Sequence, residues 1–158
     1  METAGSTSQS ISVLVVDNQL AVRTGIIELL AAQPDMIVAG EADNGLEALA
    51  QAKAVKPDLI LMDVGMPACN GIEATYLILH ELPQVKIVIL AESDDDQYLF
   101  QAIEAGAQGY LLKDLEPEAL LKMVRGVFKG EAPISRSAAG RILREFSRRA
   151  NSEADITN

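Results

Sequence analysis

The sequence predicts an α/β fold in which a doubly wound parallel sheet has helices on both faces. Strand-like and helix-like segments alternate five times over roughly 120 residues. The strand segments are uniformly apolar, which is typical of parallel strands that are buried on both faces. Three of them end at a carboxylate or a lysine, and parallel α/β sheets place their ligand sites at the carboxyl ends of the strands. We therefore expect a polar site at that edge of the sheet.

The first part of the pattern contains two strands, each followed by a helix. A β-branched, apolar strand is predicted at residues 11–16, and apolar residues at helical spacing predict a helix at 20–32. Residues 36–42 form the second strand. Asn44 is a suitable N-cap for the second helix, which ends before Pro57. We expect three residues of this helix to face inward: Leu46, Leu49 and Ala50.

The central part is built around an apolar run that ends abruptly at Asp63 and is followed by a turn. The turn at residues 70–71 leads into a third helix, and a fourth buried strand is expected at 86–90. Asp94–Asp96 open the next helix, where negative charge favours the N-terminal end of the helix dipole. Gly106 is suited to end that helix.

The last part begins with a strand at residues 108–112, which places Lys113 at its carboxyl end. Proline early in the first turn favours a helix that starts at 116–117, and Gly130 ends it. One more helix is expected at 135–149, with five arginines around a shared apolar face: Ile134, Ala138, Ile142, Leu143 and Phe146. We interpret it as a linker or dimerisation helix rather than as a helix that reads DNA.

These patterns divide the chain into four parts. The predicted parts are a disordered leader (1–10), one folded domain (11–130), a linker or dimerisation helix (131–150) and a disordered tail (151–158).

Composition excludes several classes of protein. The net charge of −10 argues against autonomous binding to nucleic acid or to an anionic membrane. No apolar run approaches the roughly 18 residues of a membrane span, and the polar first ten residues do not form a signal peptide. The single cysteine, Cys69, cannot form an internal disulfide, which suits a reducing compartment. We expect a cytoplasmic protein.

The marked strand ends suggest a specific chemistry. With the strand order 2-1-3-4-5, Asp17-Asn18, Asp63 and Lys113 would meet at one edge of the sheet. Carboxylate and amide oxygens suit Mg²⁺. A metal and a lysine beside a nucleophilic carboxylate are the groups required to transfer a phosphoryl group to Asp63.

These residues resemble those of a response regulator receiver domain, and more narrowly of the LuxR/NarL type. The resemblance covers roughly residues 11–130 and rests on three segments: 13–17, 63–67 with Gly71, and 109–114. It implies a flavodoxin-like (βα)5 fold for a two-component signalling protein that is not an enzyme in the ordinary sense. It also implies a histidine kinase as phosphodonor, a homodimer, and DNA binding only through a further C-terminal domain.

The resemblance also implies a role for each site residue. Asp63 would be the phosphoacceptor, Lys113 would contact the phosphoryl group, and Tyr110 would change rotamer on activation. The residues implied to hold Mg²⁺ are Asp17, the residue at position 18, Asp63 and the backbone carbonyl of Gly65.

Two positions depart from the family pattern. Asn18 stands where a second acid is expected, which removes one formal charge and should weaken Mg²⁺ binding. Ala91 stands where a serine or threonine would contact the phosphoryl group, so about 1.5–3 kcal/mol of charge-assisted hydrogen bonding is absent.

Two other functions remain open at this point. A pseudo-receiver would act as a dimerisation or protein-binding module that ignores phosphate, and Asn18 and Ala91 favour it. A nucleotide- or flavin-binding domain would share the architecture, but no glycine-rich loop follows the first strand.

Overall fold

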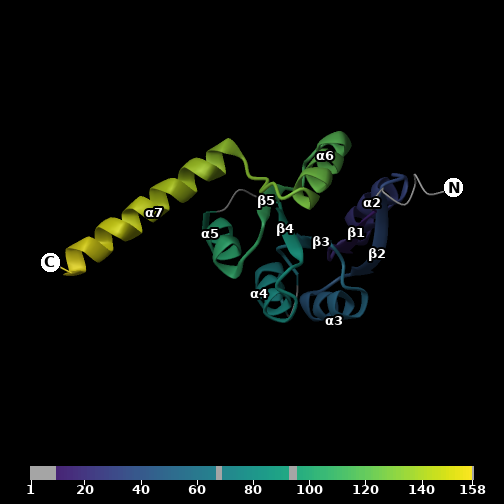
Figure 1. The fold of residues 1–158 in the computed structure, drawn as a ribbon, viewed down its shortest axis with the longest axis horizontal. Helices are drawn as coiled ribbons and strands as arrows, with labels where there is room; N and C mark the ends of the chain where they lie inside the picture. The colour runs from purple at the N-terminus through teal and green to yellow at the C-terminus, as the bar shows by residue number, and fades with distance from the viewer. Residues whose placement is uncertain (1–9, 67–68, 93–95, 158) are drawn as a thin grey trace.

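The computed structural model describes residues 10–66, 69–92 and 96–157 (Figure 1). Strands and helices alternate along the chain, and a long last helix follows them. The strands are β1 (Ile11–Val16), β2 (Met36–Ala42), β3 (Leu59–Asp63), β4 (Lys86–Ala91) and β5 (Gly109–Leu112). The helices are α2 (Leu20–Ala31), α3 (Gly45–Val55), α4 (Gly71–Glu81), α5 (Asp96–Ala105), α6 (Pro117–Phe128) and α7 (Arg136–Thr157).

The five strands form one parallel sheet in the order β2-β1-β3-β4-β5, as predicted. Side chains alternate between its two faces and build two separate cores. Helices α3, α4 and α5 contribute to the core on one face, and α2 and α6 contribute to the core on the other. Strand order reverses between β1 and β3, and sheets of this kind place their ligand sites at the carboxyl ends of the strands at such a point.

Local signals in the sequence account for most helix ends. The Asn44 side chain accepts a hydrogen bond from the Glu47 N–H at the start of α3, and Asn70 forms a reciprocal capping box with Glu73 at the start of α4. Gly106 has a φ of 103°, a left-handed conformation that suits glycine. The predicted start of the next helix was Asp94–Asp96. Residues 94 and 95 lie outside the described residues, and helix α5 begins at Asp96 in the part that the structure describes.

The predicted inward face of α3 was wrong in part. Leu46 is 58% exposed and Ala50 is exposed as well, whereas the buried residues are Gly45, Ala48 and Ala52. The small residues allow α3 to approach the sheet closely, so the helix is rotated away from the face that its leucines suggested. Leu49 lies between these extremes and packs against the core.

The chain beyond α6 is tied to the edge of the sheet. Tyr110 N–H donates to the Pro133 carbonyl at 3.1 Å, and Tyr110 forms an isolated parallel bridge with Ile134. Helix α7 then extends away from the sheet (Figure 1) and continues to Thr157, past residue 150, where we had expected a disordered tail. The predicted leader, 1–10, lies almost wholly outside the described residues.

Among the residues that the structure describes, no helix has both the length and the apolar character required to cross a bilayer.

Candidate functional site

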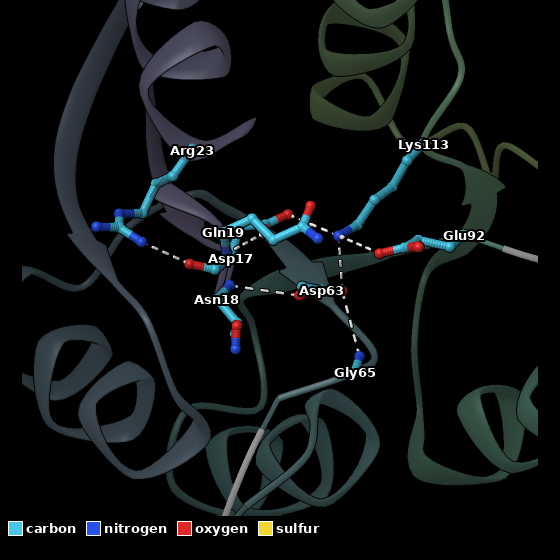
Figure 2. A network of polar contacts seen from close by, with 8 residues as sticks. All are labelled: Asp17, Asn18, Gln19, Arg23, Asp63, Gly65, Glu92 and Lys113. Carbon is cyan, nitrogen blue, oxygen red and sulfur yellow. Dashed lines mark hydrogen bonds and ion pairs between the residues drawn. The ribbon is translucent and has the colours of Figure 1, made fainter. Parts of the chain in front are cut away.

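The ends of three strands converge on one polar site, as the sequence predicted (Figure 2). Lys113 follows β5, and its Nζ lies 2.9 Å from Asp17 Oδ2 and 2.9 Å from Asp63 Oδ1. Asp17 follows β1 and Asp63 ends β3. The two aspartates are only 1% and 5% exposed, so one ammonium group pairs with two buried carboxylates.

The charge of Lys113 is held in place by its partners. Burial disfavours the ammonium form, but hydrogen bonds and Coulomb attraction from Asp17 and Asp63 outweigh it and raise the pKa of Lys113 above its usual value. A third carboxylate is close, since Glu92 Oε1 lies 3.9 Å from Lys113 Nζ. Lys113 is therefore a permanent cation at neutral pH, and it can attract an anion to the site.

Backbone N–H groups fix the orientation of both carboxylates. Gln19 N–H donates to Asp17 Oδ1 at 2.8 Å, and Gly65 N–H donates to Asp63 Oδ1 at 3.2 Å. The Asn18 N–H is 3.4 Å from Asp63 Oδ2. These contacts hold both carboxylates in place beside Lys113.

Arg23 of α2 secures the loop that carries Asp17. Its Nη1 donates to the Asp17 carbonyl at 2.7 Å, and its Nε pairs with Glu41 of β2 at 2.7 Å. Sequence reasoning missed Arg23, because its contact with the loop depends on how α2 is rotated against the strand ends.

A small cavity of about 120 Å³ adjoins Asp63. Its lining residues come from the loops that follow β3 and β4 and from α5: Asp63, Val64, Gly65, Ala91, Glu92 and Tyr98. Ala91 ends β4, where the sequence placed it, and its methyl group is buried. A phosphoryl group on Asp63 would have this space beside it. Sequence reasoning assigned no role to Glu92, although it directly follows β4, or to Tyr98 of α5, because neither belongs to the family pattern that we used.

The donor set around Asp63 fits a hard divalent cation, although its arrangement is only partly that of a metal site. Two carboxylates, Asp17 and Asp63, lie beside Asn18 and the Gly65 backbone. In Figure 2 the Asn18 side chain points away from Asp63, and its backbone N–H is the group directed at that carboxylate. Within the described residues, no group of three or more His, Cys, Asp or Glu side chains surrounds a common point. A cation here would depend on the amide and the carbonyl as well as on the two acids.

Tyr110, the predicted switch residue, is buried in β5. It is 3% exposed and belongs to the core that α3, α4 and α5 cover. It lies three positions before Lys113 in the sequence. Its predicted rotamer change stays a prediction, and the structure adds that its backbone is bonded to the Pro133 carbonyl.

Comparison with known proteins agrees with this geometry. Residues 13–125 match the model of the response regulator receiver domain family. The uncharacterized transcriptional regulatory protein YxjL of Bacillus subtilis is 48% identical over 87% of this chain. The nitrate/nitrite response regulator protein NarL of Escherichia coli K12 is 34% identical over 96% of this chain and 70% of its own length. The chain spans 63% of the length of YxjL.

Solved structures show the same architecture. A LuxR-family two-component response regulator from Aurantimonas sp. SI85-9A1 superposes with a TM-score of 0.79 at 29% identity, over 88% of this chain and 99% of that one. The signal receiver domain of the putative response regulator NarL from Mycobacterium tuberculosis gives a TM-score of 0.73 at 30% identity, over 78% and 99%.

Proposed function

The chain belongs to the response regulator receiver family, with relatives of the LuxR/NarL type, and we propose from this premise that it accepts a phosphoryl group on the carboxylate of Asp63. A receiver is a signalling phosphoacceptor rather than a classical enzyme. The observation that carries the proposal is the Asp17–Lys113–Asp63 arrangement, in which a buried nucleophile lies beside a fixed cation.

The phosphodonor in this proposal is a phosphohistidine of a histidine kinase. An Asp63 oxygen attacks phosphorus, the bond from phosphorus to the histidine nitrogen breaks, and the histidine leaves with the electron pair. Lys113 then exchanges one of its carboxylate contacts for a phosphoryl oxygen. Because Lys113 is already within 2.9 Å of Asp63, this exchange requires only a small movement of the ammonium group.

Receiver domains typically bind Mg²⁺, and we assign this role to Asp17, Asn18, Asp63 and the Gly65 carbonyl. Bound there, the cation would neutralise charge on the transferring phosphoryl group. Asn18 supplies a neutral oxygen where an acid would add a charge, so we expect weaker binding than a site with three acids would give.

The test uses a small-molecule phosphodonor. Acetyl phosphate or beryllofluoride with Mg²⁺ should give an adduct at Asp63, seen by intact mass or by NMR shifts of Gly65 and Lys113. Asp63→Asn should abolish the adduct. Asp114→Asn, which removes an exposed acid next to Lys113, is the matched control and should retain it. Absence of an Asp63-dependent adduct at millimolar ligand would reject the proposal.

A second candidate function is a pseudo-receiver that binds partners without regard to phosphate. It is favoured by Ala91, which offers no hydroxyl at the end of β4, and by Asn18. Self-association that is unchanged by Asp63→Asn and by the phosphodonor would support this function, and a clear dependence on phosphorylation would exclude it.

The partners of the proposed function follow from the relatives. Several relatives are named transcriptional regulatory proteins. We propose that the chain acts as a homodimer in the cytoplasm and influences DNA binding through a further C-terminal domain. The net charge of −10 of the chain itself does not favour binding to DNA.

A further inference from the structure

Two exposed apolar patches lie on the side of the molecule formed by α4, α5 and α7. Eight large hydrophobic side chains are exposed among the described residues, and four of them form these two patches. Tyr76 and Leu77 of α4 are 61% and 37% exposed, and Leu143 and Phe146 of α7 are 68% and 66% exposed. Paired apolar patches of this kind are typical of interaction surfaces.

The first patch borders a shallow groove between α4 and α5. The groove has a volume of about 450 Å³. Its lining combines apolar side chains with two glutamates: Ile72, Glu73, Tyr76, Leu77, Gln101, Glu104 and Ala105. The groove is therefore apolar at its centre and acidic at its rim.

The second patch has the opposite charge. Residues 136–149 of α7 contain five arginines and one glutamate, although the whole chain has a net charge of −10. Leu143 and Phe146 are three residues apart and so share one face of the helix, and Arg144 lies between them in sequence. The patch is thus apolar with a basic surround.

Helix α5 separates the two patches and joins them into one face. Arg149 of α7 pairs with Glu104 of α5 at 2.9 Å, and Phe146 borders a small cavity of about 50 Å³ with Phe100 and Ile103 of α5. Glu104 also lines the α4–α5 groove. The face is therefore basic and apolar on the α7 side and acidic and apolar on the α4 side. Figure 1 shows α5 between these two helices.

We propose that this face is a dimer interface, in which α7 of one copy lies in the α4–α5 groove of a second copy. A two-fold interface must be complementary to itself. A face with one basic and one acidic half meets that condition, because a two-fold rotation brings the basic half of each copy against the acidic half of the other. Leu143 and Phe146 of each copy then lie against Tyr76 and Leu77 of the other copy. The same contact therefore occurs two times in the dimer, and both apolar patches of each copy are covered.

Charge decides between this arrangement and the alternatives. Pairing α7 with α7 would bring the arginines of two helices together, and like charges in one interface are unfavourable. A nucleic acid would meet the basic helix but also the glutamates of the groove and the acidic chain behind it. The acidic groove of a second copy suits both the charge and the apolar character of α7.

The inference deepens the homodimer part of the proposed function and rests on that part alone, not on phosphorylation of Asp63. A cysteine pair provides the first test. Tyr76→Cys and Phe146→Cys are made separately in the full chain and oxidised alone and as a mixture. Native Cys69 is left in place, because it is buried and burial raises the pKa of its thiol.

We expect a covalent dimer in the mixture and little in either variant alone. Covalent dimers of Phe146→Cys alone would show α7–α7 pairing and would overturn the inference. A mixture that forms no mixed dimer would also overturn it.

Sedimentation velocity provides the second test. Phe146→Glu and Tyr76→Glu should each raise the dimer dissociation constant at least about tenfold, because each buried aromatic is lost twice in a two-fold dimer. Leu46→Glu, at an exposed leucine of α3 outside this face, is the matched control and should leave the constant within about twofold. Raising the salt from about 0.1 M to about 1 M should weaken the wild-type dimer.

The outcomes separate the two levels of the proposal. A wild-type chain that stays monomeric at all concentrations would reject both the homodimer and this interface. A dimer that is insensitive to Phe146→Glu and Tyr76→Glu would reject this interface and leave the homodimer standing.

Discussion

At the scale of single residues, the polar site depends on Lys113. Its ammonium neutralises two carboxylates that the fold removes almost completely from water. An unpaired buried charge is far more costly than a paired one. The same residue that would hold a phosphoryl oxygen therefore also stabilises the resting fold, and its two roles can be separated by pH.

Lys113→Met should destabilise the protein by about 3 kcal/mol at pH 7, because Asp17 and Asp63 would lose their buried partner. The ion pairs raise the pKa of Lys113 above 10.5 despite the opposing effect of burial. Its stabilisation is thus fully present below pH 10.5 and is lost as pH rises through the folded-state pKa. Urea unfolding should show a difference between wild type and variant that narrows above pH 10.5. Lys122→Met, at an exposed lysine of α6, should have little effect at any pH, and an equal loss there would contradict the argument.

Ala91→Thr should restore the missing hydroxyl beside Asp63. The cavity of about 120 Å³ next to Ala91 gives the larger side chain room. A charge-assisted hydrogen bond of about 1.5–3 kcal/mol corresponds to beryllofluoride binding that is tighter by about tenfold or more. Tyrosine fluorescence can follow the titration, because the chain has no tryptophan and Tyr98 lines the cavity. Ala91→Val has a similar shape without the hydroxyl, and tighter binding to that variant would refute the explanation.

The residues of the site that the sequence revealed are those at strand ends. Asp17, Asp63 and Lys113 could be predicted because a parallel sheet brings its carboxyl ends together whatever the details of packing. Arg23 could not, since its contacts depend on the rotation of a helix. Glu92 also follows a strand, but the family pattern assigns it no role. The direction of the Asn18 side chain is likewise set by local backbone geometry that no spacing encodes.

At the scale of elements, α4 is coupled directly to the strand that carries Asp63. Gly71, the first residue of α4, lies so close to β3 that an added Cβ would meet the Asp63 carbonyl. Gly71 N–H donates to the Val64 carbonyl at 3.0 Å, and Asn70 caps the helix from the same turn. Any shift of the Asp63 backbone is therefore transmitted to the start of α4.

Gly71→Ala and Gly25→Ala form a matched pair for this coupling. The first adds a methyl group against backbone and should destabilise by at least about 2 kcal/mol, with NMR shifts around Asp63. The second lies in α2, where nothing lies within 4 Å of an added Cβ, and should stabilise by about 0.5–1 kcal/mol. Thermal unfolding of both variants checks the signs. Equal effects from the two substitutions would show that only helix propensity matters.

The extent and order of the elements could be read from the sequence more reliably than the faces that they bury. Caps and breakers mark the ends of α3 and α4 locally, as Asn44 and Asn70 do. The prediction for the buried face of α3 was wrong in part, because it gave more weight to the hydrophobicity of Leu46 and Leu49 than to the small size of the alanines. Close packing on the sheet instead selected the small Ala48 and Ala52.

At the scale of the whole molecule, the segment between α6 and α7 belongs physically to the sheet. Gly109 packs so closely on Pro133 that an added Cβ would clash, and Gln108 Nε2 donates to the Glu131 carbonyl at 3.2 Å. A division of the chain at residue 130 remains a prediction, but it would cut these contacts. We propose that the folded unit extends through Ser135, whose Oγ accepts the Ala138 N–H at 3.0 Å.

Two truncated chains test this boundary. A chain that ends at residue 135 should be more stable than one that ends at 130 by about 1–3 kcal/mol, because the shorter chain leaves the buried Tyr110 N–H without the Pro133 carbonyl. Both chains lack α7, so the difference isolates residues 131–135. Hydrogen exchange at Tyr110 should be faster in the shorter chain, and indistinguishable stabilities would place the boundary back at 130.

The contact between β5 and Pro133 also determines how the sheet ends. An open outer strand presents unpaired backbone groups to which a strand of another molecule can add. Here that side of β5 is covered, and the covering residue is a proline, which has no N–H with which to extend the ladder. Addition of a strand from another molecule is therefore disfavoured at Tyr110, whose N–H already donates to the Pro133 carbonyl.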